Sequence, residues 1–145
     1  MYLKRMERRA RVIRREHFSA AHRLYDPALD DAQNFRRFGA CSNPGGHGHN
    51  YGLEVTVEGE IDEATGMVLD LRVLHEVLQA VILDKVDHRN LNTEVDFLHG
   101  LQPTTENLAR RIFEQLQPAL PTGRVVNVRV QETDKNSAEY GRLDG

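Results

Sequence analysis

Three histidines in the first third of the chain have the residue type and spacing of a metal site. His47 and His49 are two residues apart, so in an extended segment their side chains point to the same face. His22 closes another segment with strand character, residues 11–22. Three neutral imidazoles without a fourth protein ligand suit a zinc ion with one open coordination position. The alternative is a group of surface histidines in a polar loop, but we favour the metal site and therefore a metal-dependent enzyme.

Cys41 could take part in the chemistry of the same site. Five residues separate it from His47, in a stretch that includes Asn43, Pro44, Gly45 and Gly46. A free cysteine is most often a small buried hydrophobic residue. Beside a cation it can instead ionise and act as a base, or it can complete a closed zinc site as the fourth ligand. We favour the base, because a catalytic zinc ion keeps its fourth position open.

Two acidic segments later in the chain are further candidates. Asp87 is followed directly by His88, and a carboxylate beside an imidazole can fix its tautomer and relay protons. A favourable helix C-cap explains this pair nearly as well. Glu132 ends a valine-rich strand. It is either a solvated charge or an anchor for a guanidine-like edge of a heterocycle, whose N–H donors match one carboxylate.

The size and composition are those of an ordinary globular protein. The chain has 145 residues, a net charge of −3 and one cysteine, which predicts a single domain over residues 1–145. The charge gives no argument for nucleic acid or membrane binding, and no apolar run is long enough to span a bilayer. One cysteine cannot form an internal disulfide, so we expect a cytoplasmic protein.

Basic residues are concentrated near the N-terminus. We expect residues 1–10 to form a solvated basic arm that leads into a strand, with an anion-attracting rim as the alternative. The basic residues of the first sixteen positions are Lys4, Arg5, Arg8, Arg9, Arg11, Arg14 and Arg15.

Hydrophobic periodicity predicts four strands and two helices. In chain order these are strands over 11–22 and 51–57, a helix that Asp70 caps, a helix over 103–118, and strands over 124–131 and 138–142. The first helix has the apolar stripe Leu71, Leu74, Leu78, Val81 and Ile82. In the strand over 124–131 the residues expected to face the core are Val126, Val128 and Val130.

This order of elements, ββααββ, favours an α+β fold in which a four-stranded antiparallel sheet carries two helices on one face. Residues 25–46 are rich in Gly and Pro and are interpreted as a long functional loop. Four strands leave two unpaired sheet edges, and oligomerisation by edge pairing would cover them.

Several motifs agree in order and spacing with one known family. They are Phe18 to Leu24, Cys41 with His47 to Tyr51, Gly59 to Asp62 with Thr65 to Val68, Asp87-His88 with Leu91-Asn92, Pro103 to Asn107, and Glu132 to Asp134. With this set, which extends from about Val12 to Tyr140, the chain resembles the 6-pyruvoyl-tetrahydropterin synthase family.

The resemblance implies a tunnelling fold (T-fold), in which trimers close their sheets into a barrel and two trimers stack as a hexamer. It also implies residue roles by motif position. His22, His47 and His49 would hold zinc, and Cys41 would be the general base. Asp87 and His88 would relay protons from a neighbouring subunit. Glu132 would anchor a pterin ring, with help from the helix start at Thr104, Thr105 and Glu106.

The implied reaction converts 7,8-dihydroneopterin triphosphate into 6-pyruvoyl-tetrahydropterin with release of triphosphate, as in tetrahydrobiopterin biosynthesis. The sister activity, 6-carboxytetrahydropterin synthase of queuosine and 7-deazapurine biosynthesis, is the alternative. The five-residue gap between Cys41 and His47 is typical of the pyruvoyl type. A third possibility is a non-catalytic pterin or metal binder, against which the intact Cys41, Asp87 and His88 argue.

Overall fold

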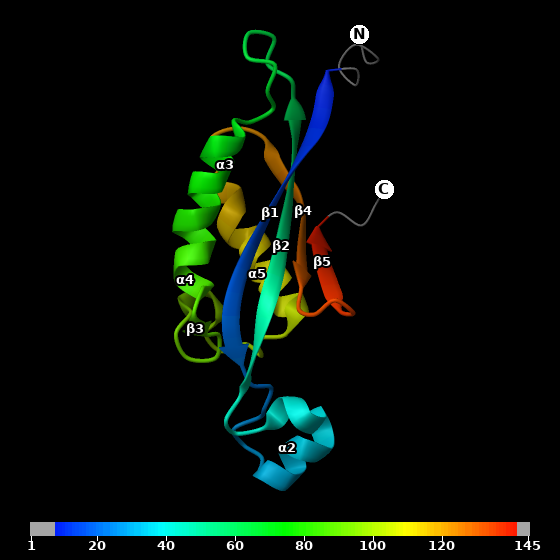
Figure 1. Ribbon diagram of the computed structural model, residues 1–145, viewed down its shortest axis with the longest axis vertical. Coiled ribbons are helices and arrows are strands. Elements are labelled where there is room, and N and C mark those ends of the chain that lie inside the picture. Colours follow the sequence, from blue (N-terminus) through cyan, green and yellow to red (C-terminus); the bar gives the residue numbers. More distant parts are fainter. Residues whose placement is uncertain (1–7, 142–145) are drawn as a thin grey trace.

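The computed structural model describes residues 8–141, which form one mixed sheet with helices on one of its faces (Figure 1). The strands are β1 (Arg9–His22), β2 (His47–Glu60), β3 (Arg89–Asn90), β4 (Arg124–Gln131) and β5 (Ser137–Gly141). The helices are α2 (Asp31–Phe38), α3 (Leu71–Leu78), α4 (Asp84–Val86) and α5 (Thr105–Leu116). The strand order is β3-β1-β2-β4-β5, which confirms an α+β fold.

The sheet has five strands and is not purely antiparallel, so the prediction of four antiparallel strands was wrong. The additional strand β3 pairs in parallel with the end of β1, through Ala20 with Arg89 and Ala21 with Asn90. A strand of two residues has no periodicity of its own, which is why the sequence does not reveal it. All other strand pairs are antiparallel.

The hairpin of β1 and β2 is the longest feature of the sheet. Each strand has 14 residues, and their register extends from Arg9 opposite Glu60 to His22 opposite His47. Strand β2 therefore begins four residues before the predicted start at Tyr51 and includes both histidines of the His-Gly-His motif. Because side chains alternate along a strand, His22, His47 and His49 all point to the face that the helices cover.

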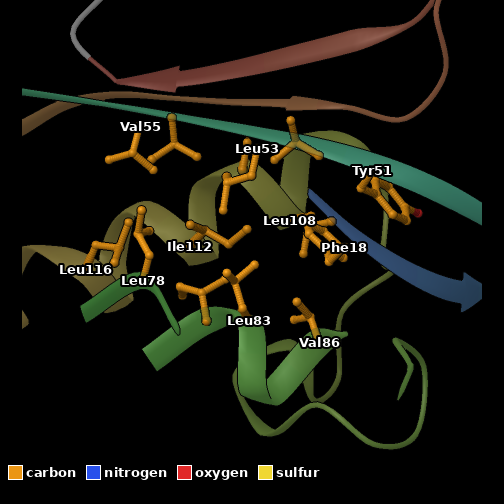
Figure 2. Packing of buried hydrophobic residues seen from close by; sticks show 14 of the residues in the cluster. Phe18, Tyr51, Leu53, Val55, Leu78, Leu83, Val86, Leu108, Ile112 and Leu116 are labelled. Carbon is orange, nitrogen blue, oxygen red and sulfur yellow. The ribbon is translucent and has the colours of Figure 1, made fainter. Parts of the chain in front are cut away.

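The hydrophobic core lies between this face and the helices (Figure 2). Strand residues such as Leu53 and Val55 pack against Leu108 and Ile112 of α5 and against Leu78 of α3. Helix α5 begins after the N-cap Thr104, whose hydroxyl accepts a hydrogen bond from Asn107 N, and it confirms the helix predicted over 103–118. Helix α3 begins after Asp70 as predicted and continues through a π-turn (Gln79–Leu83) into α4.

Two of the predicted core positions differ in the structure. Leu71 is 46% exposed at the start of α3. In β4 a bulge opposite Thr56 and Val57 pairs Val125 with Val57, so Val125 joins the main core cluster in place of Val126. An inserted residue reverses the alternation of a strand, which the sequence pattern does not predict.

Residues 25–46 include a helix that the loop interpretation missed. Asp30 caps α2 with its side chain on Gln33 N, and the Gln33 side chain accepts in return from Asp30 N, which is a complete capping box. A 3₁₀ turn over Gly39–Ser42 follows directly and contains Cys41. Figure 1 places α2 beyond the end of the sheet, on the connection from β1 to β2. The connection is therefore ordered, and it holds the cysteine near the end of the hairpin.

The opposite face of the sheet carries ion pairs. Arg9 and Arg11 contact Glu58, and Arg15 contacts Glu54. Arg9 and Ala10 already belong to β1, so the basic arm predicted over 1–10 ends before them. Residues 1–7, with Lys4 and Arg5, lie outside the described residues. Across residues 8–141, no helix has the length and apolar character needed to cross a lipid bilayer.

Glu16 provides a test of how acid affects the fold. Its carboxylate accepts hydrogen bonds from His75 Nδ1 at 2.7 Å and Arg14 Nε at 2.8 Å, and its side chain is 14% exposed. Burial alone would raise the pKa of Glu16, but these hydrogen bonds outweigh it and hold the pKa below its usual value. A carboxyl with a lowered folded-state pKa stabilises the fold above its unfolded pKa, and that stability is lost as the pH falls through the folded pKa.

We therefore expect Glu16→Gln to lower the free energy of unfolding by about 1–3 kcal/mol at neutral pH. Between neutral pH and pH 4, the free energy of unfolding should fall less in this variant than in the unmodified protein. Urea denaturation at both pH values measures this. Glu54→Gln, which removes a carboxylate paired with the exposed Arg15, is the control and should cost under about 1 kcal/mol. Equal effects of the two substitutions would contradict the prediction.

Candidate metal centre and active site

The structure brings His22, His47 and His49 together at the end of the β1–β2 hairpin. One nitrogen of each ring lies within 4.8 Å of those of the other two. His22 faces His47 directly across the strand pair, and their ring centres are 4.6 Å apart. His49 lies one pleat further along β2, with its ring 4.9 Å from that of His47. The cluster can hold a metal ion.

The hydrogen bonds of the rings fit a metal. His22 Nδ1 lies 2.8 Å from the Pro103 carbonyl, to which it donates as an N–H, so its Nε2 is left with a lone pair. Nε2 of both His22 and His49 is buried without any hydrogen-bond partner. Buried polar atoms are rarely left unpaired, and a backbone carbonyl that holds the second nitrogen is the usual support of a metal-bound histidine. This donor set of three nitrogens fits a zinc ion.

The electrostatic surroundings favour the neutral imidazoles that bind metals. Burial lowers the pKa of His22, His47 and His49, and repulsion from a neighbouring histidine lowers each pKa further. The carboxylate of Glu132 acts in the opposite direction but does not reverse the shift. Protonation therefore competes less with a metal here than at an ordinary histidine.

The backbone next to this cluster requires a glycine at position 46. Its φ is +72°, and a Cβ at this position would lie 3.2 Å from the His22 carbonyl oxygen. Gly45 has neither a positive φ nor a close neighbour. Of this glycine pair, Gly46 is therefore the one that allows the backbone to approach the end of β1 closely.

Glu132 lies beside the three histidines, although 82 residues separate it from His49. Its Oε1 is 3.7 Å from His49 Nε2, and its Oε2 is 4.0 Å from His22 Nε2. The Thr105 hydroxyl donates a hydrogen bond of 2.8 Å to Oε2. Strand β4 ends at Gln131 and α5 begins at Thr105, so the end of a strand and the start of a helix place these groups together.

A pocket of about 360 Å³ opens at the same place. It is lined by the four residues that the sequence proposed for a substrate and by three that the sequence analysis did not single out. The first group is Thr104, Thr105, Glu106 and Glu132, and the second is Leu24, Asn136 and Ser137. Asn136 closes the turn after Glu132, because its carbonyl accepts a hydrogen bond from Glu132 N. Glu132 thus lines the pocket and lies next to the three histidines.

Cys41 lies on the 3₁₀ turn and is partly buried. Its carbonyl accepts a hydrogen bond from Leu24 N at 2.9 Å. Among residues 8–141, the group that can hold a metal consists of the three histidines and does not include the Cys41 sulfur. That arrangement favours an open coordination position over a closed four-ligand site.

Asp87 and His88 are held at a different place on the sheet. Asp87 Oδ1 lies 3.0 Å from His88 Nδ1 and accepts from Ser19 N, and this backbone hydrogen bond is the main reason that the pKa of Asp87 is lowered. Ser19 and Asn50 hydrogen bond to each other on the sheet face opposite to the side chains of His22 and His49. Together with His88 and His49 they line a depression. The polar contacts of the pair are therefore with Ser19 of β1 and with each other.

His88 also has an unusual backbone. Its φ is +59°, and it is the non-glycine residue with positive φ among residues 8–141. Its N–H donates to the Ser19 carbonyl at 2.6 Å. Such strain persists where the surrounding structure enforces it and is concentrated at functional sites. The imidazole of His88 is 82% exposed and lies 3.0 Å from the Asp87 carboxylate.

Comparison with known proteins agrees with this fold and site. The family description "6-pyruvoyl tetrahydropterin synthase" matches residues 11–142. The human protein named 6-pyruvoyl tetrahydrobiopterin synthase is 48% identical over 131 residues, which cover 90% of each chain. The Drosophila melanogaster protein of the same name is 45% identical over 130 residues, 89% of this chain and 77% of its own.

A solved structure has the same fold. The Caenorhabditis elegans 6-pyruvoyl tetrahydropterin synthase superposes with a TM-score of 0.85 at 41% sequence identity, covering 92% of this chain and 96% of that one. The family description covers nearly the whole chain, and the sequence and structural relatives agree with it. This chain belongs to the 6-pyruvoyl tetrahydropterin synthase family.

Proposed function

We propose that this chain is a zinc-dependent lyase that converts 7,8-dihydroneopterin triphosphate into 6-pyruvoyl-tetrahydropterin and releases triphosphate. The observation that carries the proposal is the position of Glu132, which lies 3.7 Å from His49 Nε2 and also lines the pocket at the start of α5. A pterin ring held by this carboxylate has its side chain next to the three histidines. Membership of the family supports the same reaction.

The pocket recognises the ring through hydrogen bonds. The two oxygens of Glu132 accept N–H donors from the aminopyrimidine edge, a paired arrangement that gives both energy and orientation. Thr105 fixes the carboxylate through its hydroxyl. The Thr104 hydroxyl is already used as the N-cap of α5, so Thr104 shapes the pocket more than it binds the ring. Glu106 lines the same opening.

The reacting side chain of the substrate then lies between the histidines and the 3₁₀ turn Gly39–Ser42, which we call the cysteine turn. His22, His47 and His49 hold the zinc ion, and the Pro103 carbonyl fixes the His22 ring. When bound, zinc supplies Lewis-acid polarisation of the side-chain hydroxyls, which makes the adjacent C–H bonds more acidic. The Cys41 thiolate accepts one of these protons as the general base. When the proton is returned to another atom of the substrate, the side chain is oxidised and the ring is reduced. Elimination of triphosphate follows. A cytoplasmic location keeps Cys41 a free thiol.

Asp87 and His88 complete the site of a neighbouring subunit. They lie at the edge of β1, where Asp87 accepts from Ser19 N and His88 N donates to the Ser19 carbonyl. Within residues 8–141, β3 covers this edge only at Ala20 and Ala21, and β5 forms the opposite edge. Edges of this kind are covered when sheets pair between subunits. Trimers closed into a barrel, and two such trimers in a hexamer, satisfy both observations.

Product analysis tests the proposed function. Zinc-loaded protein is incubated with 7,8-dihydroneopterin triphosphate, with and without a reagent that traps acetaldehyde, and the pterin is identified by mass spectrometry. A pyruvoyl side chain together with free triphosphate is the expected result. A carboxyl group at the same ring position, with acetaldehyde released, would instead assign the chain to the 6-carboxytetrahydropterin synthase activity and overturn the proposal.

Substitution of Glu132 tests the pocket. Glu132→Gln keeps the size of the side chain but can no longer accept two N–H donors, so we expect substrate affinity to fall about 10- to 100-fold, equivalent to the loss of a charge-assisted hydrogen bond. Isothermal titration with a pterin that lacks the triphosphate measures this directly. Asp134→Asn makes the same change of charge at an exposed position of the same turn and should leave affinity unchanged. Unaltered binding by Glu132→Gln would remove its anchoring role.

A further inference from the structure

The connection that carries Cys41 is attached to the end of β1 by two consecutive residues. Leu24 N donates to the Cys41 carbonyl at 2.9 Å, and Arg23 Nε donates to the Ser42 carbonyl at 2.8 Å. Arg23 directly follows His22. One short segment therefore joins a residue of the histidine cluster to Cys41 and Ser42 of the cysteine turn.

The side chain of Arg23 is held firmly where the chain leaves the sheet. Its guanidinium carbon lies 3.9 Å from the centre of the Tyr25 ring, and Nη2 lies 3.6 Å from Asp31 Oδ1 at the start of α2. Only 19% of the side chain is exposed. Stacking on an aromatic ring and a paired carboxylate restrict the rotamers of the guanidinium, so its hydrogen bond to Ser42 is geometrically defined.

The main chain of Arg23 is fixed as well. Asn92 accepts from Arg23 N through Oδ1 at 2.7 Å and donates to the Arg23 carbonyl through Nδ2 at 2.7 Å. Asn92 lies four residues after His88, in the segment that follows α4. One side-chain amide therefore satisfies both polar groups of the Arg23 backbone, which leaves the outgoing chain little freedom.

We propose that Arg23 is a positioning residue for Cys41, with its guanidinium setting the place of the cysteine turn relative to the histidine cluster. The turn itself contributes local hydrogen bonds, from the Ser42 hydroxyl to the Gly39 carbonyl and from Asn43 N to the Ala40 carbonyl. Its direct hydrogen bonds to the residues that follow β1 come from Leu24 and Arg23, and Asn92 holds the main chain of Arg23. The inference rests on the proposed function for its effect on rate, because a misplaced base slows proton transfer steeply.

Arg23→Met tests this role, since it keeps the length of the stem and removes every donor. We expect kcat to fall 10- to 100-fold, KM to stay within about threefold, and the zinc content to remain one per chain, because misplacement of a catalytic group by about 1 Å costs on this scale. Hydrogen exchange should become faster at the Leu24 amide and in the peptide over 39–43, while the amides of the β1–β2 hairpin stay protected. Asn92→Leu should also lower kcat. In the double variant the loss of transition-state stabilisation should be smaller than the sum of the losses in the two single variants.

Arg37→Met is the matched control. Arg37 belongs to α2 in the same connection, but its side chain is 56% exposed and its guanidinium pairs with Asp26 at 3.3 Å. It should leave kcat, KM and the exchange of residues 39–43 as in the unmodified protein.

Three results would overturn the proposal. One is an unchanged kcat in Arg23→Met with unchanged exchange at Leu24. Another is a rise in KM at constant kcat, which would mean that Arg23 contacts the substrate itself. The last is loss of zinc, which would assign the effect to His22. Hydrogen exchange does not depend on turnover, so failure of the proposed function would leave the positioning of the turn still measurable.

Discussion

Cys41→Ala should reduce turnover about 10²- to 10⁴-fold, the usual contribution of a positioned general base, while the protein keeps its fold and its zinc. The sulfur lies outside the group of side chains that can hold a metal, and the turn is fixed through the Cys41 carbonyl and the Ser42 carbonyl. Neither contact uses the thiol. Removal of the sulfur should therefore abolish proton abstraction by Cys41 without moving the backbone of the turn.

Steady-state kinetics, zinc analysis and circular dichroism on the same preparation check this prediction. Cys41→Ser is the informative companion, because it keeps the shape of the side chain but has a hydroxyl that is not ionised near neutral pH. It should be almost as inactive as the alanine variant. Loss of zinc in either variant would make Cys41 a ligand, and turnover within tenfold of the unmodified protein would exclude it as the base.

The elements that support the site were predictable where the pattern is local. The start of α5 followed from Pro103, the capping threonine and the acidic first turn, and the structure has the cap at Thr104. His47 and His49 were expected on one face because of alternation, and they lie on one face of β2. These predictions depend on contacts between residues that are close in sequence, which a single chain reveals.

Other features depend on partners far away along the chain. The two-residue strand β3 exists because His88 N and Leu91 N find the Ser19 and Ala21 carbonyls at the edge of β1. The bulge in β4 is defined against β2 and shifts the core position to Val125. The sequence pattern has no information on either pairing. Helix α2, in contrast, had a readable signal in the capping box of Asp30 and Gln33, which the abundance of glycine and proline around it obscured.

The site itself combines both kinds of information. The resemblance assigned Glu132 to the ring, but its distances of 3.7 Å and 4.0 Å from two histidine nitrogens emerge only when β4 and α5 are packed. The separation of Asp87 and His88 from Cys41 within one chain is likewise a property of the packed sheet. It gives the expectation of a shared active site a physical reason, because the polar contacts of the pair are with Ser19 at the edge of β1.

His47→Ala should remove zinc and activity together. His22 is 1% exposed and belongs to the packed interior, so its replacement would disturb the fold as well as the site. His47 is only partly buried at the first position of β2, which makes it the better probe of metal binding alone. Loss of one of three protein ligands should weaken zinc binding by more than about 100-fold, beyond the 10- to 100-fold cost of losing a group that merely supports a ligand.

Competition with a chromophoric chelator measures this affinity, and His99→Ala is the control because His99 is exposed and lies outside the cluster. The pH dependence has a defined sign. Zinc binds the neutral imidazoles, and burial lowers the pKa of all three histidines, so zinc should be retained at pH values below the usual histidine pKa and released only on further acidification. Stoichiometric zinc in His47→Ala would reduce the site to two histidines, and Glu132, 3.7 Å from His49 Nε2, would then be the nearest candidate for the missing ligand.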